Sequence, residues 1–393
     1  MSDESRQTLF SQADHGYMAR ALQLARKGLY TTDPNPRVGC VIVRDEQIVG
    51  EGFHLRAGEP HAEVHALNAA GEQAKGATAY VTLEPCSHTG RTGPCAEALK
   101  AAKVARVVVA MVDPNPQVSG RGIRLLKDAG IDVVVGLLES DARALNPGFI
   151  ARMSKQRPFV RLKMAMSIDG RTAMGSGESQ WITGPEARCQ VQRLRARSSA
   201  ILSGVESLIM DDSRLTLRAE QLQLDNAEDI VRRQPLRVIL DTQLRLPVAA
   251  ACLSEPGRTL VITTPAHSPE KRARLTQAGA EVHVLPAGSD GRIDLALMLQ
   301  WLAENEQINE LLVETGATLA GAMLDAELID ELQLFVAPTL LGGEARPLFA
   351  LPGLSRMADQ RGLTIHDMRA VGRDWRIIAS PQATSATGNS KVP

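Results

Sequence analysis

One histidine, one glutamate and two cysteines of this 393-residue chain stand in a pattern that can hold a catalytic metal ion. His61 and Glu63 flank an alanine at the predicted start of a helix, and Cys86 and Cys95 follow in the same region. One imidazole and two thiolates are ligands that zinc prefers, and three protein ligands leave a fourth tetrahedral position open for water. A nearby glutamate that is not a ligand can carry protons to and from that water. We therefore predict a catalytic zinc bound by His61, Cys86 and Cys95, with Glu63 as the proton carrier.

A plainer interpretation of these two cysteines is that both are small buried apolar residues. Each of them follows a proline, however, and Cys95 opens a helical pattern, where a helix N-terminus favours a thiolate. Eight residues separate the two cysteines, which is longer than the gap in the general pattern of zinc deaminases. His65 lies one helical turn after His61 and is the alternative ligand.

Composition and charge limit the classes of protein to which the chain can belong. Apolar residues make up 44% and charged residues 23%, which is typical of a globular protein. The 44 Lys and Arg residues balance 45 Asp and Glu residues, so we do not expect nucleic acid as the main partner. We expect no membrane span and no secretory signal, because no apolar segment has the required length. An odd number of cysteines, five, favours the reducing cytoplasm over a disulfide framework.

Helical and strand patterns alternate along the first half of the chain, which predicts a layered α/β sheet. We expect helices over 14–27, from 61 onward, over 95–102 and over 122–129, and strands over 39–43, 48–53, 79–83, 107–111 and 132–135. The predicted zinc ligands then lie at helix starts beside strand ends, where open α/β sheets carry their sites.

A second α/β series follows a lapse of the apolar pattern near 146–158, where we place the boundary. Its predicted strands are 159–166, 200–204, 236–241, 259–263, 281–285, 310–314 and 332–337, with helices over 185–196 and 317–324. We therefore expect a first domain over 1–153, a second over 158–380 and a disordered tail over 381–393.

The segment 314–321 reads as a strand, a glycine turn and a helix start, which can present backbone N–H groups to a phosphate. Turn glycines without a ligand are the alternative, at about even weight. The GxGxxG fingerprint of dinucleotide-binding domains does not open this half of the chain. The residues alone thus predict no more than a nucleotide site here.

Over nearly its whole length the chain resembles the bifunctional riboflavin-biosynthesis family, in which a pyrimidine deaminase is fused to a pyrimidine reductase. The segments that carry the resemblance are 32–43, 57–66, 80–88, 167–173 and 177–183. The resemblance implies a cytidine-deaminase-like three-layer domain followed by a dihydrofolate-reductase-like domain. It also accounts for the long gap between the cysteines and for the absence of the GxGxxG glycines.

The resemblance implies two successive reactions on a phosphorylated ribosylaminopyrimidine, with Zn²⁺ and NADPH as cofactors. The pyrimidine ring first loses an amine as ammonia, and its ribosyl chain is then reduced to ribityl. In the deaminase half, the resemblance assigns substrate binding to Asn35, His54, His88 and Arg91. For Asn35, in Asp-Pro-Asn-Pro, the alternative is an ordinary turn former.

The resemblance also assigns the ligand-binding residues of the reductase half. Those expected to contact NADPH are Ala165, Trp181, Ser207, Asp211, Gly316, Ala317, Thr318, Leu319, Ala320, Gly321 and Ala322. Those expected to contact substrate are Ser179, Arg195, Leu215, Arg218 and Glu314. The two arginines suit a phosphate clamp, although a solvated helix face is the alternative for Arg195.

Two short segments of the reductase half depart from the family pattern. Thr315-Gly316-Ala317 stands where Gly-Gly-Pro is usual, and Ser213 stands where a proline is usual. Both departures fall near the expected coenzyme site.

Two other functions fit part of the pattern. A nucleoside or transfer-RNA deaminase shares the zinc ligands, but the balanced charge and the large second domain weigh against it. A zinc-stabilised module that only binds a pyrimidine has no need of Glu63 as a proton carrier. We expect small phosphorylated pyrimidines as ligands and a homo-oligomer as the assembly.

Overall fold

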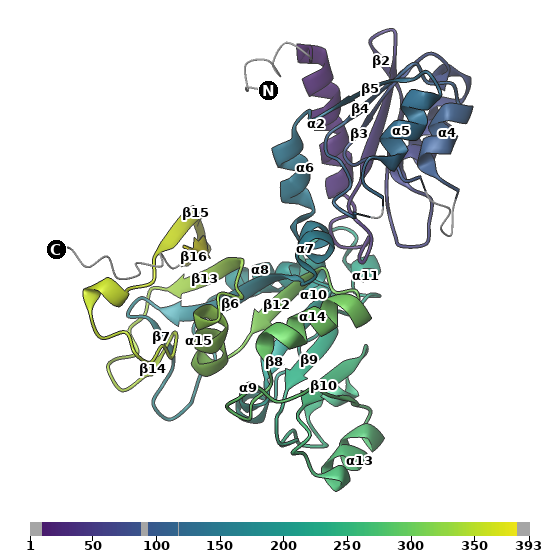
Figure 1. The fold of residues 1–393 in the computed structure, drawn as a ribbon. Helices are drawn as coiled ribbons and strands as arrows, with labels where there is room; N and C mark the ends of the chain where they lie inside the picture. Colours follow the sequence, from purple (N-terminus) through teal and green to yellow (C-terminus); the bar gives the residue numbers. More distant parts are fainter. Residues whose placement is uncertain (1–9, 88–92, 117, 383–393) are drawn as a thin grey trace, which may run out of the picture. The chain divides into compact units, whose positions relative to one another are not determined.

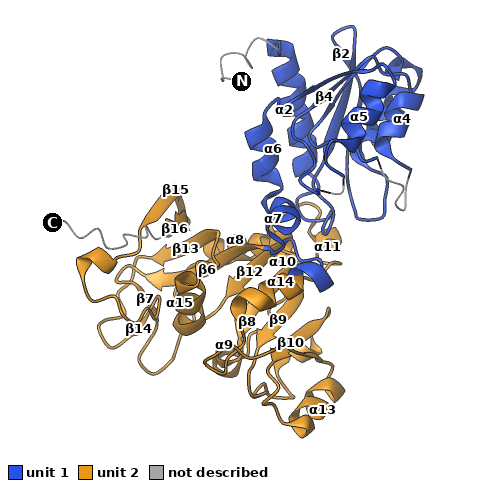
Figure 2. Cartoon of the chain, in the orientation of Figure 1, with its two compact units in different colours: residues 1–158, 303–309 blue, residues 159–302, 310–393 orange. Residues whose placement is uncertain are grey.

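The computed structural model describes residues 10–87, 93–116 and 118–382, and it divides the chain into two compact units. The first unit comprises residues 1–158 and 303–309, and the second comprises residues 159–302 and 310–393 (Figure 2). Figure 1 labels the elements of both units. None of the helices within the described ranges is long and apolar enough to cross a membrane.

The first unit is a mixed β-sheet between two layers of helices. The strand order is β2-β1-β3-β4-β5, with β1 antiparallel to both neighbours and β3, β4 and β5 parallel. Its elements are α2 (Gln12–Arg26), β1 (Gly39–Arg44), β2 (Gln47–Phe53), α3 (Ala62–Ala70), η1 (Gly71–Ala74), β3 (Thr78–Val81), α4 (Cys95–Ala101), β4 (Arg106–Val109), α5 (Arg121–Asp128), β5 (Asp132–Val135), α6 (Glu139–Leu145) and α7 (Pro147–Lys155).

Side chains that point alternately to the two faces of the sheet build these layers. Cys40 and Ile42 of β1 pack in one apolar cluster with α3, α4 and α5, while Val41 and Val43 pack in another with α2 and α6. Because successive strand residues point to opposite faces, a strand that is apolar throughout must be covered on both sides. This is the three-layer fold that the sequence predicts for the first domain.

The expected boundary segment contains a helix that the sequence pattern does not predict. Helix α7 runs from Pro147 to Lys155, and the second unit begins at Phe159. Pro147 occupies the first turn, where the missing N–H has no intrahelical partner to lose. The sequence pattern lapses here without indicating a helix, and a proline at this position is compatible with a helix start.

The second unit is a nine-stranded sheet in the order β11-β10-β9-β8-β12-β6-β13-β16-β15. In this order, every neighbouring pair from β11 to β13 is parallel, and the β15–β16 hairpin adds an antiparallel edge. The strands are β6 (Phe159–Ser167), β7 (Arg171–Ala173), β8 (Ala200–Gly204), β9 (Leu236–Leu240), β10 (Thr259–Thr263), β11 (Glu281–Val284), β12 (Glu310–Glu314), β13 (Glu331–Ala337), β14 (Arg346–Pro347), β15 (Leu363–Val371) and β16 (Asp374–Pro381).

Helices connect the parallel strands and leave their carboxyl ends accessible. They are α8 (Pro185–Arg197), α9 (Val205–Asp211), α10 (Ala219–Leu222), α11 (Ala227–Ile230), α12 (Ala251–Ser254), α13 (Pro269–Gln277), α14 (Leu295–Asn305), α15 (Ala317–Asp325) and the short η2 (Met357–Asp359). The predicted strands of this half are present, but the hairpin is an addition. Strand β16 extends to Pro381, and residues 383–393 of the expected tail lie outside the described ranges.

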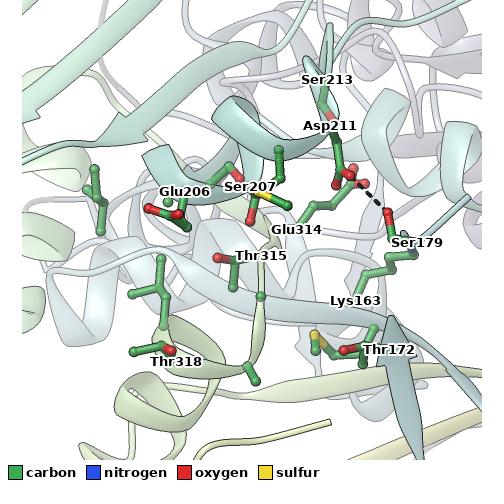
Figure 3. Close-up of a pocket in the computed structure, with 18 of the residues that line it drawn as sticks. Lys163, Thr172, Ser179, Glu206, Ser207, Asp211, Ser213, Glu314, Thr315 and Thr318 are labelled. Atoms are coloured by element: carbon green, nitrogen blue, oxygen red, sulfur yellow. Dashed lines mark hydrogen bonds between the residues drawn. The ribbon is translucent and has the colours of Figure 1, made fainter. Parts of the chain in front are cut away.

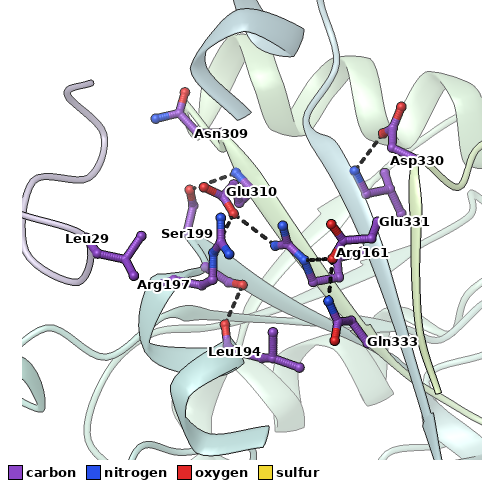
Figure 4. Close-up of polar contacts among 12 residues, drawn as sticks. Leu29, Arg161, Leu194, Arg197, Ser199, Asn309, Glu310, Asp330, Glu331 and Gln333 are labelled. Carbon is purple, nitrogen blue, oxygen red and sulfur yellow. Dashed lines mark hydrogen bonds and ion pairs between the residues drawn. The ribbon is translucent and has the colours of Figure 1, made fainter. Parts of the chain in front are cut away.

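A buried ion cluster joins the beginnings of three of these strands (Figure 4). Arg161 of β6 is 1% exposed, and its Nη1 donates to Glu310 Oε2 of β12 at 2.9 Å. Arg197 Nε donates to the same oxygen at 3.0 Å, and Arg161 Nε also donates to Glu331 at the start of β13. Such paired charges are costly to break once buried. The cluster lies at the amino ends of the strands, opposite the edge where α/β sheets carry ligands.

Candidate zinc centre and coenzyme pocket

Three helix and strand ends of the first unit bring one imidazole and two thiols together. His61 precedes α3 as its N-cap, Cys95 is the first residue of α4, and Cys86 lies in the loop after β3. His61 Nδ1 is 3.3 Å from Cys95 Sγ and 3.6 Å from Cys86 Sγ. In the described part of the chain these residues form the group suited to a metal, and His65 is not a member of it.

The spacing of these atoms fits a zinc ion. With zinc–sulfur bonds of about 2.3 Å and zinc–nitrogen bonds of about 2.0 Å, a tetrahedral site places the nitrogen about 3.5 Å from each sulfur. The observed separations of 3.3 and 3.6 Å agree with that value. The donor set of one nitrogen and two sulfurs is also characteristic of zinc.

Within the cluster, the surroundings favour the thiolate form of Cys86 and the protonated form of His61. Hydrogen bonding from the Cys95 thiol lowers the pKa of Cys86, and the Cys95 backbone N–H also donates to its sulfur at 3.3 Å. The pKa of His61 is raised, chiefly through its contact with Cys86. A bound zinc would take over this charge, because a metal-coordinating thiol is deprotonated outright.

Glu63 lies two residues after His61, on the first turn of α3, and is 3% exposed. Its Oε2 is buried and has no hydrogen-bond partner among the described residues. Burial raises the pKa of Glu63 to about 7, and the charge on Cys86 acts in the same direction. A buried carboxyl oxygen without a partner is costly unless a ligand or water completes it. Glu63 therefore has the environment of a proton carrier near neutral pH.

Two of the predicted substrate residues contact each other beside this cluster. Asn35 Nδ2 lies 3.0 Å from His54 Nε2, and the rings of His54 and His61 lie 5.1 Å apart. Burial lowers the pKa of His54 to about 4, so this imidazole is neutral. Its Nδ1 faces the Pro60 carbonyl oxygen at 3.2 Å and must carry the proton, which leaves Nε2 to accept from Asn35. The other two predicted residues, His88 and Arg91, lie outside the described ranges.

A cavity of about 1240 Å³ lies at the carboxyl ends of the parallel strands of the second unit (Figure 3). This volume exceeds the roughly 300–1,000 Å³ of a site for one small molecule, so it suits a coenzyme together with a substrate. The predicted residues that line it are Ala165, Ser179, Trp181, Arg195, Ser207, Asp211, Leu215, Arg218, Glu314, Gly316, Ala317, Thr318, Leu319 and Ala322.

Two predicted coenzyme residues do not line the cavity. Ala320 and Gly321 lie on the packed side of α15, where both are buried. A Cβ on Gly321 would come within 2.0 Å of the Ala350 carbonyl oxygen. A continuous run of residues cannot all face one side of a helix, because each residue is rotated by 100° from the last.

The departures from the family pattern leave the local backbone intact. Gly316 is the N-cap of α15 with an extended backbone, and Ala317 begins the helix where the family usually has proline. Alanine is compatible with this first position. Ser213 lines the cavity after Asp212, which closes α9 in a left-handed conformation.

Arg195 is held by Glu314 rather than lying free for a ligand. Its Nε and Nη2 donate to the two carboxylate oxygens of Glu314 at 2.6 and 3.0 Å, and its Nη1 donates to the Thr216 carbonyl at 3.0 Å. Its side chain is 13% exposed, which excludes the solvated helix face. Although burial opposes ionisation, Arg195 holds the pKa of Glu314 below its usual value.

Lys163 is a cavity residue that the sequence analysis does not single out. It lies in β6 and lines the cavity, where burial lowers its pKa although the charge of Glu314 opposes that shift. Burying a lysine in a sheet strand is costly, and its presence in β6 was the signal in the sequence. Two other cavity residues contact each other, since Ser179 Oγ donates to Asp211 Oδ1 at 2.8 Å (Figure 3).

The fold and these two sites define a class of protein, a zinc-dependent deaminase joined to a reductase. Two family descriptions agree: "Cytidine and deoxycytidylate deaminase zinc-binding region" matches residues 11–111 and "RibD C-terminal domain" matches residues 158–377. The chain belongs to the RibD family of riboflavin biosynthesis proteins. It is thus a bifunctional deaminase and reductase with zinc and NADPH as cofactors.

Individual relatives cover the chain almost completely. The chain is 51% identical to the riboflavin biosynthesis protein RibD of Escherichia coli K12 over 92% of its own length and 97% of that protein. The Acinetobacter baumannii RibD structure is 48% identical, with a TM-score of 0.87 over 94% of this chain and 99% of that one. A Thermotoga maritima structure, described as a diaminohydroxyphosphoribosylaminopyrimidine deaminase/5-amino-6-(5-phosphoribosylamino)uracil reductase, is 32% identical with a TM-score of 0.80 and the same coverage. The expected cytidine-deaminase-like and dihydrofolate-reductase-like folds are confirmed.

Proposed function

We propose that the chain deaminates 2,5-diamino-6-(5-phospho-ribosylamino)pyrimidin-4(3H)-one and then reduces the ribosyl chain of the product with NADPH. The end product is 5-amino-6-(5-phospho-ribitylamino)uracil. The observation that carries this proposal is the buried, unpartnered Oε2 of Glu63 beside the His-Cys-Cys cluster. The description of the Thermotoga maritima relative supports the same substrates.

In the deamination, His61, Cys86 and Cys95 hold the zinc ion. Bound zinc supplies a Lewis acid that lowers the pKa of a water in its open position. Glu63 Oε2 would accept a proton from water, and the resulting hydroxide would add to the amine-bearing ring carbon. Glu63 would then return the proton to the amine as its carbon–nitrogen bond breaks, so one carboxylate acts as base and then as acid. Neutral His54 and Asn35 orient the pyrimidine, and we assign His88 and Arg91 to substrate from the resemblance.

In the reduction, NADPH supplies a hydride to the ribosyl chain. We assign the coenzyme to Ala165, Trp181, Ser207, Asp211 and the first turn of α15. The assignment to α15 is supported by Gly316, Ala317, Thr318 and Leu319, which present its N-terminus to the cavity. The substrate then lies against the side chains that remain at the same cavity, which are Ser179, Arg195, Leu215, Arg218 and Glu314.

The domains and location follow from the same assignment. We propose residues 1–153 as the deaminase domain and residues 158–380 as the reductase domain, with the division of the structure near Pro158 in support. We place the protein in the cytoplasm, and its five cysteines, all free of disulfides, support this location.

A direct test uses the purified full-length chain. With the diaminopyrimidine precursor we expect ammonia release without NADPH, and NADPH oxidation only after deamination. Ammonia release from free cytidine or from transfer RNA, without release from the precursor, would contradict the proposal and favour the nucleoside or transfer-RNA deaminase.

Arg195→Ala should separate the two reactions. The change removes the charge-assisted hydrogen bond from Arg195 to Glu314 at the cavity. Without the arginine, the negative charge of Glu314 repels the phosphate of the substrate. We expect reduction of the deaminated intermediate to weaken by about 10- to 150-fold. Ammonia release should persist, since the zinc cluster lies in the other unit.

Arg274→Ala is the control for the loss of one positive charge. Arg274 is an exposed residue of α13 and does not line the cavity, so both activities should be retained. Loss of both reactions in a folded Arg195→Ala protein would contradict separate sites. Arg218→Ala should weaken reduction in the same way.

We also propose that the chain forms a homo-oligomer through the β15–β16 ribbon (Leu363–Val371 and Asp374–Pro381). Ile365, Met368 and Trp375 lie on the same face of the ribbon by register and are 59%, 56% and 46% exposed. The opposite face carries an ion cluster of Asp367 with Arg369 and Arg376. An exposed apolar face on an edge strand is characteristic of an interface, and a second copy would bury it.

Ile365→Glu should dissociate this assembly. The charge would be buried without a partner at the interface, so we expect sedimentation velocity to show a smaller species than wild type. Thr364→Glu is the matched control, because Thr364 lies on the opposite face of the same strand. An Ile365→Glu protein with unchanged assembly would exclude this face.

A further inference from the structure

The turn of the β15–β16 ribbon contacts a segment far from it in sequence, the loop 179–184. Arg373 Nη2 donates to the Ile182 carbonyl at 3.1 Å, and the Gly184 N–H donates to Asp374 Oδ2 at 2.7 Å. Asp374 is 0% exposed; its Oδ2 accepts this hydrogen bond, and its Oδ1 lies 3.7 Å from Arg373 Nε. A buried carboxylate requires such hydrogen bonds, because burial without them is costly.

The turn of the ribbon also packs closely against the start of α8, which limits the residue that can occupy the turn. Gly372 has a φ of +60°, and a Cβ at that position would lie 2.4 Å from Glu186 Oε2 in the first turn of α8. Only glycine fits this position without strain. The turn of the ribbon is therefore packed against the start of α8 as well as against the loop.

The loop and helix that this turn holds carry residues of the reductase cavity. Ser179 and Trp181 lie in the loop and line the cavity, and Arg195 lies further along α8. Gly184 is the N-cap of α8, so the Asp374 carboxylate sits at the positive end of that helix. Neither Arg373 nor Asp374 lines the cavity.

We propose that Asp374 is a positioning residue of the reductase site and that Arg373 assists it. Asp374 fixes the Gly184 N–H, and with it the loop that presents Trp181 to the coenzyme. The opposite end of the loop is fixed by the hydrogen bond from Ser179 to Asp211. Because both ends of the loop are held before NADPH binds, binding does not have to include the entropic cost of ordering the loop. This inference rests on the proposed NADPH site.

The test compares Asp374→Ala with Asp374→Asn in the full-length chain, by fluorescence titration with NADPH. Alanine removes the acceptor, and we expect the dissociation constant to rise by about 2- to 30-fold, the range for a lost cap. Asparagine keeps an acceptor oxygen at the same place and should restore wild-type affinity. Hydrogen exchange of the peptide spanning 179–184 should accelerate in Asp374→Ala only. Ammonia release should be unchanged in both variants.

Asp367→Asn is the matched control, because Asp367 lies on the same ribbon and pairs with Arg369 and Arg376 instead of the loop. If Asp374→Ala does not fold, Arg373→Ala tests the same contact, since Arg373 is 55% exposed and loses its hydrogen bond to Ile182 together with its 3.7 Å ion pair to Asp374. A folded Asp374→Ala or Arg373→Ala protein with wild-type NADPH affinity would overturn the proposal. Wild-type protein that binds no NADPH would instead overturn the proposed coenzyme site.

Discussion

Replacing Glu63 with glutamine is expected to lower the rate of ammonia release by about 10²- to 10⁴-fold while zinc stays bound. The amide has the shape of the carboxyl group but cannot take up or release the proton. Glu63 Oε2 is a buried oxygen without a hydrogen-bond partner among the described residues, beside the His-Cys-Cys cluster. Steady-state ammonia release, with zinc content measured on the same sample, checks the result.

The control for this change is Glu97→Gln. Glu97 lies two residues after Cys95 on α4, but it is half exposed and pairs with Lys100 on the surface. This variant should deaminate at the wild-type rate. Reduction of the deaminated intermediate should persist in both variants, because the cavity lies in the other unit. Near wild-type ammonia release from Glu63→Gln would rule out the proton-carrying role.

Replacing His61 with alanine is expected to abolish stoichiometric zinc binding and, with it, deamination. Wild-type protein should hold about one zinc per chain. His61 Nδ1 supplies the nitrogen of the cluster, and two sulfurs alone leave the ion incompletely coordinated. Because zinc binds the folded state, its loss should also lower the unfolding temperature of the first unit. Metal analysis and calorimetry measure the two effects.

His65→Ala distinguishes the two candidate histidines. His65 lies on α3 one turn after His61 but outside the cluster, so this variant should retain zinc and activity. Full zinc occupancy in His61→Ala, with loss in His65→Ala, would reverse the assignment.

Short-range patterns predicted most of the first unit. A continuous apolar run predicted a strand over 39–43, where β1 spans Gly39–Arg44, and the placement of His61 and Cys95 at helix starts was visible in the sequence. Such features depend on neighbours within one or two turns, so the sequence contains the necessary information. The same reasoning did not predict α7, because Pro147 is compatible with a break in the pattern and with a helix start.

Long-range partners were beyond the reach of the sequence. The sequence predicts Arg195 as a phosphate ligand. In the structure Arg195 forms a bidentate ion pair with Glu314, which is more than a hundred residues away in sequence. Lys163 becomes a cavity residue only because β6 lies next to β12 in the sheet. Each of these contacts depends on which strands become neighbours, and strand order is set by the packing of the whole unit.

The sequence alone was enough to determine the chemistry of the first site, because the residue types at 61, 63, 86 and 95 define a donor set and a proton carrier whatever their surroundings. Folding decided how these groups are tuned, since burial raises the pKa of Glu63 to about 7 and leaves one of its oxygens without a partner. It also decided that Asp374, close to the end of the chain, reaches the loop beside Trp181. Burial and contact belong to three-dimensional neighbourhoods, and a linear pattern does not encode them locally.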